Sequence, residues 1–390
     1  MLVEKILFLL IQSEICGYSA DKHIQEELTE ETYKELFTLS HKHDMAHIVA
    51  SALSRCGLLK DDETSASFRR QLMKSLHRDA QRERAIELMT DLLEQAHIPH
   101  IFLKGSVLCH LYPQTWMRTS CDIDVLVHKS DFPLVETVLC SNQFSRLKDS
   151  SMHDYSFISP NRVHIEIHHT LTQDSDLAST DAILESVWDE HSTLDDGYTS
   201  RYSMTPELFI LYHVAHMGRH LLHGGCGVRP FIDLWLIKKH MPFDKEKLSI
   251  VLKQVELLKL YEAALALGEV WLEHRQHDEG TSRLESFILN GGVYGTTTNA
   301  AKVQAASGIS RVRSFTNMMF LSRQNLEVLY PGLKKHPLLL PFYQVRRWFR
   351  IVEREKQQKV KHFIDVRNSI SKNDENSAMI LLQSLGLLED

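Results

Sequence analysis

The stretch of residues 98–128 constrains the fold of this chain more than any other. It reads IPHIFLKGSVLCHLYPQTWMRTSCDIDVLVH. The apolar run at residues 101–103 ends at a Lys-Gly-Ser sequence, which is typical of a short buried strand that leads into a helix. After a Tyr-Pro break, residues 122–127 form a second apolar run that begins with two carboxylates. The pattern predicts a strand, a helix and a returning strand, and therefore a sheet covered by helices.

The two carboxylates of this second strand, Asp122 and Asp124, are expected to share one face. Side chains alternate along a strand, so these two point the same way with Cβ atoms roughly 7 Å apart, while Ile123 points into the core. Two carboxylates on one face repel each other, and folding alone gives no reason to keep them there. Hard oxygen ligands at this spacing can hold Mg²⁺ (or Mn²⁺), so the pair predicts a metal site for phosphoryl or nucleotidyl transfer.

A third carboxylate is predicted on a later strand. Residues 154–158 and 162–168 flank a Ser-Pro-Asn turn, and the second run alternates apolar and polar residues, which predicts a hairpin. Its apolar residues would face the core, whereas the opposite face would carry His164, Glu166 and His168. Glu166 could then neighbour the two aspartates, complete the metal site and take a proton from an attacking hydroxyl.

The Lys-Gly-Ser sequence suits the binding of phosphate. At Gly105 the backbone can approach a phosphate closely, the N–H groups that open the following helix favour an anion, and the Ser106 hydroxyl adds a donor. Lys104 and Arg118 lie near enough in sequence to neutralise phosphate oxygens. The alternative interpretation of the whole constellation is a solvated acidic strand edge, because an Asp-x-Asp sequence by itself is common on surface strands.

Length and composition set the limits of this interpretation. A chain of 390 residues is expected to contain two or three domains, and its net charge of −7 gives no overall attraction to nucleic acid. The six cysteines contain no CxxC pair, which argues against a disulfide framework or a cysteine zinc site and suits the cytoplasm. The apolar run at residues 6–11 is too short to span a membrane, so we expect a core helix there and no membrane partner.

Helical periodicity flanks the predicted sheet on both sides. The expected class is α+β: a helical N-terminal segment at residues 1–95, a small mixed β-sheet core at 96–172 and a helical C-terminal domain at 173–390. Within the last part the chain is expected to be helical beyond about residue 180, except for a polar loop at 275–310.

A row of histidines follows the sheet. Four of them fall along one face of a predicted helix, and a basic and an acidic residue come soon after: His213, His216, His220, His223, Arg229 and Asp233. One helix delivers only two or three ligands in good geometry, which argues against zinc. Lining of the cleft opposite the carboxylates, by His168, His216, Arg229 or Asp233, and plain helix packing are the two remaining interpretations.

A basic stretch near the C-terminus could track a nucleic-acid backbone. Residues 346–361 contain several Arg and Lys residues interleaved with Trp348 and Phe349. Acidic residues offset part of this charge, and the aromatics fit an amphipathic stripe, so a solvated helix face is the favoured interpretation and a nucleic-acid partner is not expected.

The motifs together resemble a known superfamily. Leu103-Lys104-Gly105-Ser106, followed by Arg118 and Asp122-Ile123-Asp124, is similar to the DNA polymerase β-type nucleotidyltransferases, which have a Gly-Gly or Gly-Ser helix start, an acidic-x-acidic strand and a third acidic residue on a later strand. More closely, the chain resembles a family of uncharacterised bacterial nucleotidyltransferases that share the Leu-Lys-Gly element, an arginine before Asp-Ile-Asp, an acidic-x-His strand end and a helical tail. Glu166-Ile167-His168 matches that strand end, with Glu where Asp is common.

The resemblance implies transfer of a nucleoside monophosphate from an NTP to a hydroxyl of a small molecule or protein, with release of pyrophosphate. A non-catalytic nucleotide-binding or interaction module that retains the fold is the alternative, and an RNA-directed transferase fits the acidic balance less well. Neither the residues nor the resemblance identifies the acceptor, the preferred base or the oligomeric state.

Overall fold

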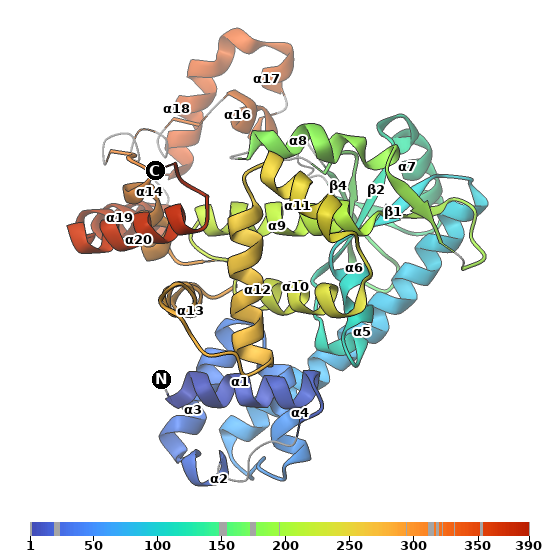
Figure 1. The fold of residues 1–390 in the computed structure, drawn as a ribbon. Coiled ribbons are helices and arrows are strands. Elements are labelled where there is room, and N and C mark those ends of the chain that lie inside the picture. Colours follow the sequence, from blue (N-terminus) through green and yellow to red (C-terminus); the bar gives the residue numbers. More distant parts are fainter. Residues whose placement is uncertain are drawn as a thin grey trace.

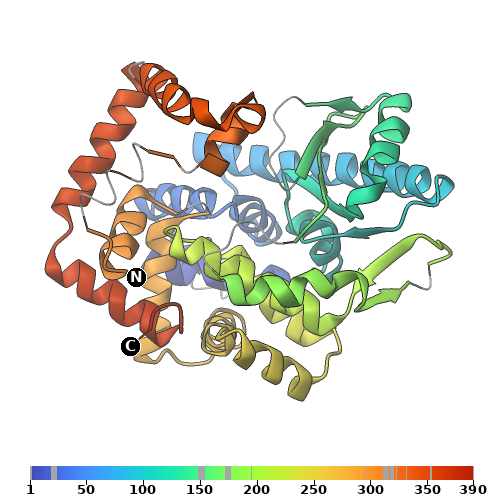
Figure 2. The same cartoon turned by 90° about the horizontal axis from the view of Figure 1, so that it is seen from above.

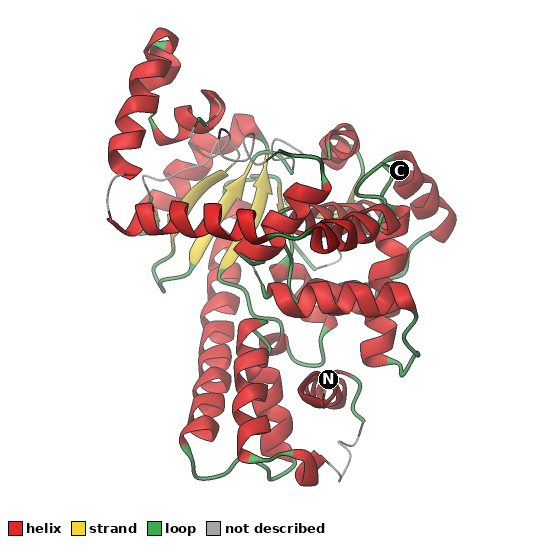
Figure 3. Cartoon of the chain, turned by 90° about the vertical axis from the view of Figure 1, so that its left-hand side faces the viewer, coloured by secondary structure: helices red, strands yellow, loops and turns green. Residues whose placement is uncertain are grey.

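The computed structural model describes residues 2–18, 24–147, 154–171, 177–194, 196–293, 295–310, 316, 320–321, 323–330, 332–351 and 354–389. The predicted α+β class is confirmed, since one mixed sheet lies among many helices (Figures 1 and 3). Among the helices described, none has both the length and the apolar character that crossing a bilayer requires.

The sheet contains seven strands in the order β3-β4-β5-β2-β1-β7-β6. In chain order they are β1 (His100–Phe102), β2 (Asp122–Val127), β3 (Ser145–Arg146), β4 (Asp154–Ile158), β5 (His164–His168), β6 (His191–Thr193) and β7 (Arg201–Met204). β2 is the central strand, antiparallel to β1 and parallel to β5. The hairpin predicted around residues 159–161 is the antiparallel pair of β4 and β5.

Two predictions about the chain beyond residue 180 are wrong. β6 and β7 extend the sheet from a region expected to be helical. The segment at 275–310, expected to be a loop, contains α13 (Glu279–Gly291) and α14 (Thr297–Ala306). β6 is exposed along its length and β7 is mostly half-buried, so neither shows the apolar alternation of a strand. α13 begins with a capping box, in which Asp278 and Thr281 satisfy each other's backbone N–H groups.

The N-terminal part is helical, as predicted. Its helices are α1 (Leu2–Ile15), α2 (Ile24–Glu27), α3 (Glu30–Lys42), α4 (Ala46–Arg55) and α5 (Glu63–Gln95). The Asp62 side chain caps α5 by accepting from the Ser65 backbone N–H. α1 packs on a helix that follows much later in the chain. The rings of Phe8 and Trp271 stack at this contact, with their centroids 4.4 Å apart. The N-terminal helices therefore share one core with the C-terminal helices.

Short helices connect the strands and longer ones follow them. The connecting helices are α6 (Gly105–Leu108), η1 (Cys109–Leu111), η2 (Thr115–Met117), η3 (Lys129–Asp131), α7 (Phe132–Ser141), α8 (Ala178–Leu184) and η4 (Glu185–Trp188). The C-terminal helices are α9 (Pro206–Leu222), α10 (Arg229–His240), α11 (Lys245–Gln254), α12 (Leu258–Leu272), α13 (Glu279–Gly291), α14 (Thr297–Ala306), α16 (Arg323–Leu329), α17 (Gly332–Lys335), η5 (Pro337–Leu339), α18 (Leu340–Ile351), α19 (Arg354–Ser369) and α20 (Lys372–Ser384). In Figure 2 the orange and red C-terminal helices lie on the opposite side of the molecule from the sheet.

The two faces of β2 pack against different helices. Ile123, Val125 and Val127 belong to the core that β2 shares with β5, α5 and α7. Leu126 belongs instead to the core that contains α9 and α10. Since side chains alternate along a strand, Asp122 and Asp124 lie on the same face as Leu126, toward the C-terminal helices.

Candidate active site

The register of β2 and β5 brings the predicted carboxylates together. Asp124 lies directly opposite Glu166, and Asp122 lies opposite His164. Two groups of potential ligand atoms result, each with its members within 4.8 Å of one another: Asp122, His164 and Glu166, and Asp124, Glu166 and His168. Glu166 belongs to both groups, and His164 is a candidate ligand that the sequence analysis did not single out.

Asp124 is the most enclosed of the three carboxylates. It is 3% exposed, and its Oδ1 accepts hydrogen bonds from Nε2 of His168 at 2.8 Å and from Nζ of Lys104 at 3.2 Å. Burial by itself would raise the pKa of Asp124, but the Lys104 ammonium and the His168 hydrogen bond outweigh it and hold the pKa well below its usual range. Asp124 is therefore ionised at any physiological pH and suits a cation.

Lys104 is held between the sheet and α9. Burial would lower the pKa of its ammonium, but the oxygens of Tyr212 and Asp124 beside it keep the pKa above its ordinary value. Its backbone has φ 42° and ψ −113°, a conformation that costs about 1–3 kcal/mol for a residue with a side chain. Such strain is found mostly where a site requires a particular side-chain direction, and here it accompanies the direction of Lys104 toward Asp124.

Ser106 shows a different environment from the one predicted for a helix start. α6 is a single turn, and the N–H groups of Ser106 and Val107 donate to the carbonyls of Leu103 and Lys104, so these two N–H groups already have acceptors. The Ser106 hydroxyl, however, is buried and has no hydrogen-bond partner among the described residues. A hydroxyl left in this state costs about 1–3 kcal/mol, which a bound oxyanion or water would recover.

Gly105 packs closely against the segment that precedes β2. A Cβ added at this position would lie 2.8 Å from Nη1 of Arg118 and 3.0 Å from both Cβ and Oγ of Ser120. Ser120 in turn donates its hydroxyl to Oδ1 of Asp122 at 2.9 Å. Glycine at this position is thus required by the contact between α6 and the residues that orient Asp122.

We expect Gly105→Ala to lower the transfer activity that the sequence resemblance implies at least about tenfold, because the new methyl group must displace Ser120 and with it Asp122. Initial rates measured alongside a thermal melt would separate this effect from unfolding. Gly280→Ala, at the beginning of α13, is the matched control, because its added Cβ meets only a side-chain oxygen of Asp278 at 3.3 Å. Equal activity of Gly105→Ala and the wild type would contradict the role given to this contact.

Arg118 forms a buried ion pair with Asp233 of α10. Its Nη2 and Nε lie 3.0 Å and 3.4 Å from the two Asp233 oxygens, and its Nη1 donates to the Thr119 carbonyl at 3.3 Å. Asp233 is fully buried and also accepts from the Tyr112 hydroxyl at 2.8 Å. Burial would raise the pKa of Asp233, but Arg118 outweighs it and lowers the pKa. The guanidinium is therefore committed to protein acceptors, and its predicted contact with phosphate stays a prediction.

Side chains from three helices, α4, α5 and α10, and from the turn before α4 contact the loop at residues 115–121. Arg229 of α10 donates to the Thr119 carbonyl at 3.0 Å and forms an ion pair with Asp44, which lies between α3 and α4. Asp44 also accepts from the Thr119 hydroxyl at 2.7 Å. Arg82 of α5 donates to the Arg118 carbonyl at 3.0 Å, and Nε2 of His47 on α4 lies 2.9 Å from the Met117 carbonyl. Three of these residues, Asp44, His47 and Arg82, were missed in the sequence, which contains no local signal for contacts so far apart in the chain.

The stability of the protein should depend on pH through His47. Burial lowers the pKa of His47 from 6.5 to about 4, only partly offset by its hydrogen bond to Met117. Because the folded-state pKa is below that of the unfolded chain, His47 favours folding above pH 6.5 and this contribution falls as the pH drops toward 4. Between pH 7 and pH 5 the loss should be about 2 kcal/mol.

Urea denaturation at the two pH values measures this difference. We expect His47→Gln, which keeps a hydrogen-bond donor but cannot titrate, to reduce the pH-dependent loss by most of that amount. His97→Gln is the control, because His97 is exposed in the turn after α5. An unchanged pH profile in His47→Gln would show that His47 is not buried as a neutral side chain.

The histidine row of α9 does not converge on a metal. Nε2 of His213 lies 2.9 Å from the Pro230 carbonyl, whereas His216 and His220 contact each other with their Nε2 atoms 3.0 Å apart. No group of potential ligands in the described part of the chain includes an α9 histidine. Because Arg219 can only donate to Nδ1 of His216, at 2.9 Å, His216 carries its proton on Nε2 and donates it to His220.

The predicted cleft-lining residues differ in their placement. His168 contacts Asp124 directly. Burial and the nearby Lys104 charge lower the pKa of His216 well below its ordinary value, so a neutral His216 lies beside the ammonium. Asp233 and Arg229 instead hold the loop at residues 115–121.

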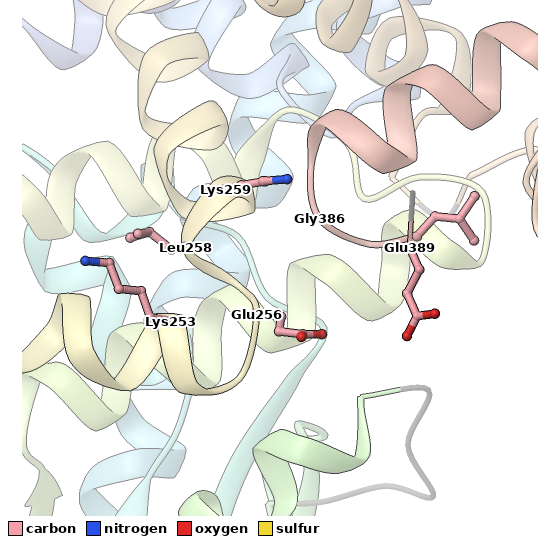
Figure 4. Close-up of a pocket in the computed structure, with 7 residues that line it drawn as sticks. Lys253, Glu256, Leu258, Lys259, Gly386 and Glu389 are labelled. Carbon is pink, nitrogen blue, oxygen red and sulfur yellow. The ribbon is translucent and has the colours of Figure 1, made fainter.

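A hollow elsewhere on the surface is separate from this site. It measures about 380 Å³ and lies between the α11–α12 connection and the turn after α20 (Figure 4). Its lining residues are Lys253, Glu256, Leu258, Lys259, Gly386, Leu388 and Glu389, and none of them belongs to the strands that carry the carboxylates. The Lys259 side chain packs against Gly386. A Cβ added to Gly386 would lie 3.5 Å from side-chain atoms of Lys259.

The donor set on β2 and β5 fits a divalent cation. Three carboxylates supply the hard oxygen ligands that Mg²⁺ prefers, and His164 and His168 add nitrogen atoms that Mn²⁺ also accepts. The parallel pairing of β2 and β5 holds two carboxylates, Asp124 and Glu166, close together. Their repulsion is unfavourable unless positive charges lie nearby, and Lys104 supplies only one positive charge.

Among known proteins, a family model matches this chain, whereas no individual curated protein or solved structure does. The family model described as "uncharacterised nucleotidyltransferase" matches residues 29–273, a range that contains β1, β2 and β5 together with Asp44, Arg229 and Asp233. With well over half of its length matched, and with the predicted carboxylates side by side, the chain belongs to this nucleotidyltransferase family.

Proposed function

We propose that this protein transfers a nucleoside monophosphate from an NTP to a hydroxyl acceptor, with a divalent cation as cofactor and pyrophosphate as the product. The observation that carries the proposal is the register of β2 and β5, which sets Asp124 beside Glu166 with Asp122 on the same face. Membership of the nucleotidyltransferase family supports the reaction class. Asp122, Asp124 and Glu166 would hold this cation, Mg²⁺ or Mn²⁺, with Glu166 shared by the two ligand groups.

A cation at this position supplies charge neutralisation on the triphosphate and lowers the pKa of the acceptor hydroxyl. Side chains of the protein supply proton transfer, further charge neutralisation and a hydrogen-bond donor. Glu166, which belongs to both ligand groups, would take the proton of the acceptor hydroxyl. The Lys104 ammonium faces the same carboxylates and offsets the charge of the phosphates, and the buried Ser106 hydroxyl is a donor without an acceptor among the residues that the structure describes.

Positioning and charge neutralisation are sufficient for this kind of chemistry. Nucleotidyl transfer requires the α-phosphate and the acceptor oxygen to be held in line, and preorganised charges then stabilise the transition state. The contacts of Lys104 with Asp124 and of Ser120 with Asp122 fix these groups before any substrate binds. Because Glu166 belongs to both ligand groups, it can serve as a ligand and accept a proton, which favours catalysis over a module that only binds nucleotides.

The test is a screen with all four NTPs, each labelled at the α-phosphate, in the presence of Mg²⁺ or Mn²⁺. We expect metal-dependent release of pyrophosphate together with label transfer to a hydroxyl-bearing small molecule or to a protein. Asp122→Asn should remove both signals. Tight NTP binding without pyrophosphate release under any metal would instead support a nucleotide-sensing module.

A further inference from the structure

The helices α16 and α18, with the connecting α17 and η5, form a separate arm. In Figure 1 they lie at the top of the molecule, away from the N-terminal helices. The arm has a small core of its own, in which Leu326, Tyr330 and Leu333 are buried against Leu340 and Tyr343. This core involves one side of α18, and large apolar side chains on the other side are exposed.

The outward side of α18 and the turn before it is apolar. Leu338 is 93% exposed, Phe342 58% and Val345 42%, and their spacing of four and three residues places them on one helical face. The inward side, in contrast, buries the amide of Gln344, which is 6% exposed. A helix side that faces only water usually carries polar residues, so this exposed apolar face needs another explanation.

The arm and the helix after it also concentrate positive charge. Residues 334–361 contain nine Lys and Arg residues and two Glu residues, in a chain whose net charge is −7. Arg346 is exposed next to the apolar face, and Lys361 is exposed further along. Apolar side chains flanked by basic ones are the features of a helix that lies in the plane of an anionic lipid surface.

We propose that the apolar face of Leu338, Phe342 and Val345 binds the surface of an anionic phospholipid bilayer. The apolar side chains enter the boundary between headgroups and acyl chains, and exposed basic side chains such as Arg346 contact the lipid phosphates. Nucleic acid would account for the charge but not for three exposed aliphatic and aromatic side chains along one face. A second copy of the chain is disfavoured, because a symmetric contact would bring two of these basic segments together.

The inference goes beyond the proposed transfer reaction and does not depend on it. Vesicle sedimentation of the full chain tests it, with vesicles of phosphatidylcholine alone and with about one third phosphatidylglycerol at moderate salt. We expect binding to the anionic vesicles at least about tenfold stronger than to the neutral ones. The paired variant Phe342→Glu with Val345→Glu should lose that binding, whereas Ile250→Glu should retain it, because Ile250 is 66% exposed on α11 away from the arm.

Three further measurements, of thermal stability, oligomeric state and RNA binding, make the outcome decisive. Thermal melts of the variants should match the wild type, since the replaced side chains are exposed. Equal binding to both kinds of vesicle, anionic binding that survives the paired Glu variant, or no binding at all would each overturn the proposal. It would also be overturned by a dimer in solution that the paired variant dissociates, or by tight, salt-sensitive RNA binding in the absence of vesicle binding.

Discussion

Asp124→Asn is expected to lower nucleotidyl transfer about a thousandfold or more, which corresponds to about 4 kcal/mol of lost transition-state stabilisation. Asparagine has nearly the same shape as aspartate and can still accept hydrogen bonds from Lys104 and His168, so the fold should persist. What it lacks is the negative charge that a cation requires. Since Lys104 then loses its buried counter-charge, a fall in Tm of a few degrees should accompany the change.

Asp131→Asn is the matched control for this prediction. Asp131 follows β2 closely in the chain but belongs to neither ligand group, so its replacement should leave transfer within about twofold of the wild type. The measurement is the initial rate of pyrophosphate release at saturating NTP and a range of Mn²⁺ concentrations. If Asp124→Asn retained wild-type kcat at every metal concentration, the carboxylate cluster could not be the transfer site.

Much of the candidate site could be predicted because its signals are local. Strand alternation places Asp122 and Asp124 on one face, and a one-residue change of register would have moved both into the core. The period-two alternation of residues 162–168 likewise predicted that Glu166 and His168 share one face of their strand, opposite Ile165 and Ile167. The structure adds the pairing of this strand with β2, in parallel, which no local pattern specifies.

The partners of the loop at residues 115–121 could not be predicted, for a physical reason. Asp44 and Arg229 are 185 positions apart in the chain, and each contacts Thr119, which lies far from both in sequence. A polar side chain at a helix end has the same local pattern whether it faces water or a distant loop. Only the docking of α4, α5 and α10 around this loop determines which of these side chains are buried.

The same limit explains why β6 and β7 were missed. β7 joins the sheet through two paired positions with β1, His100 with Arg201 and Ile101 with Tyr202. Strands this short form because an edge of the sheet is available, and their own residues show little strand periodicity. The apolar face of α18 is a related case, since its exposed residues precede the basic stretch and an apolar side chain has the same local pattern whether it faces a core or water.

The largest expected effect on stability comes from Asp233. Asp233→Leu leaves the Arg118 guanidinium buried without its counter-charge and removes the acceptor of the Tyr112 hydroxyl, so the free energy of unfolding should fall by about 3–5 kcal/mol. Arg118→Met should cost a similar amount, because it leaves Asp233 charged in a fully buried position. The double variant Arg118→Met with Asp233→Leu should cost clearly less than the sum, since it replaces the pair with apolar side chains.

The same cycle decides what Arg118 does in the reaction. If Arg118 only holds Gly105 and the following loop in place, transfer should recover in the double variant along with stability, because the loop keeps its contacts with Arg82 and Arg229. We expect this outcome, given that all three guanidinium nitrogens already have protein acceptors. A stable double variant with a raised KM for NTP would instead show that Arg118 leaves Asp233 to contact a phosphate, and the ion pair would then be a resting position for a substrate-binding residue.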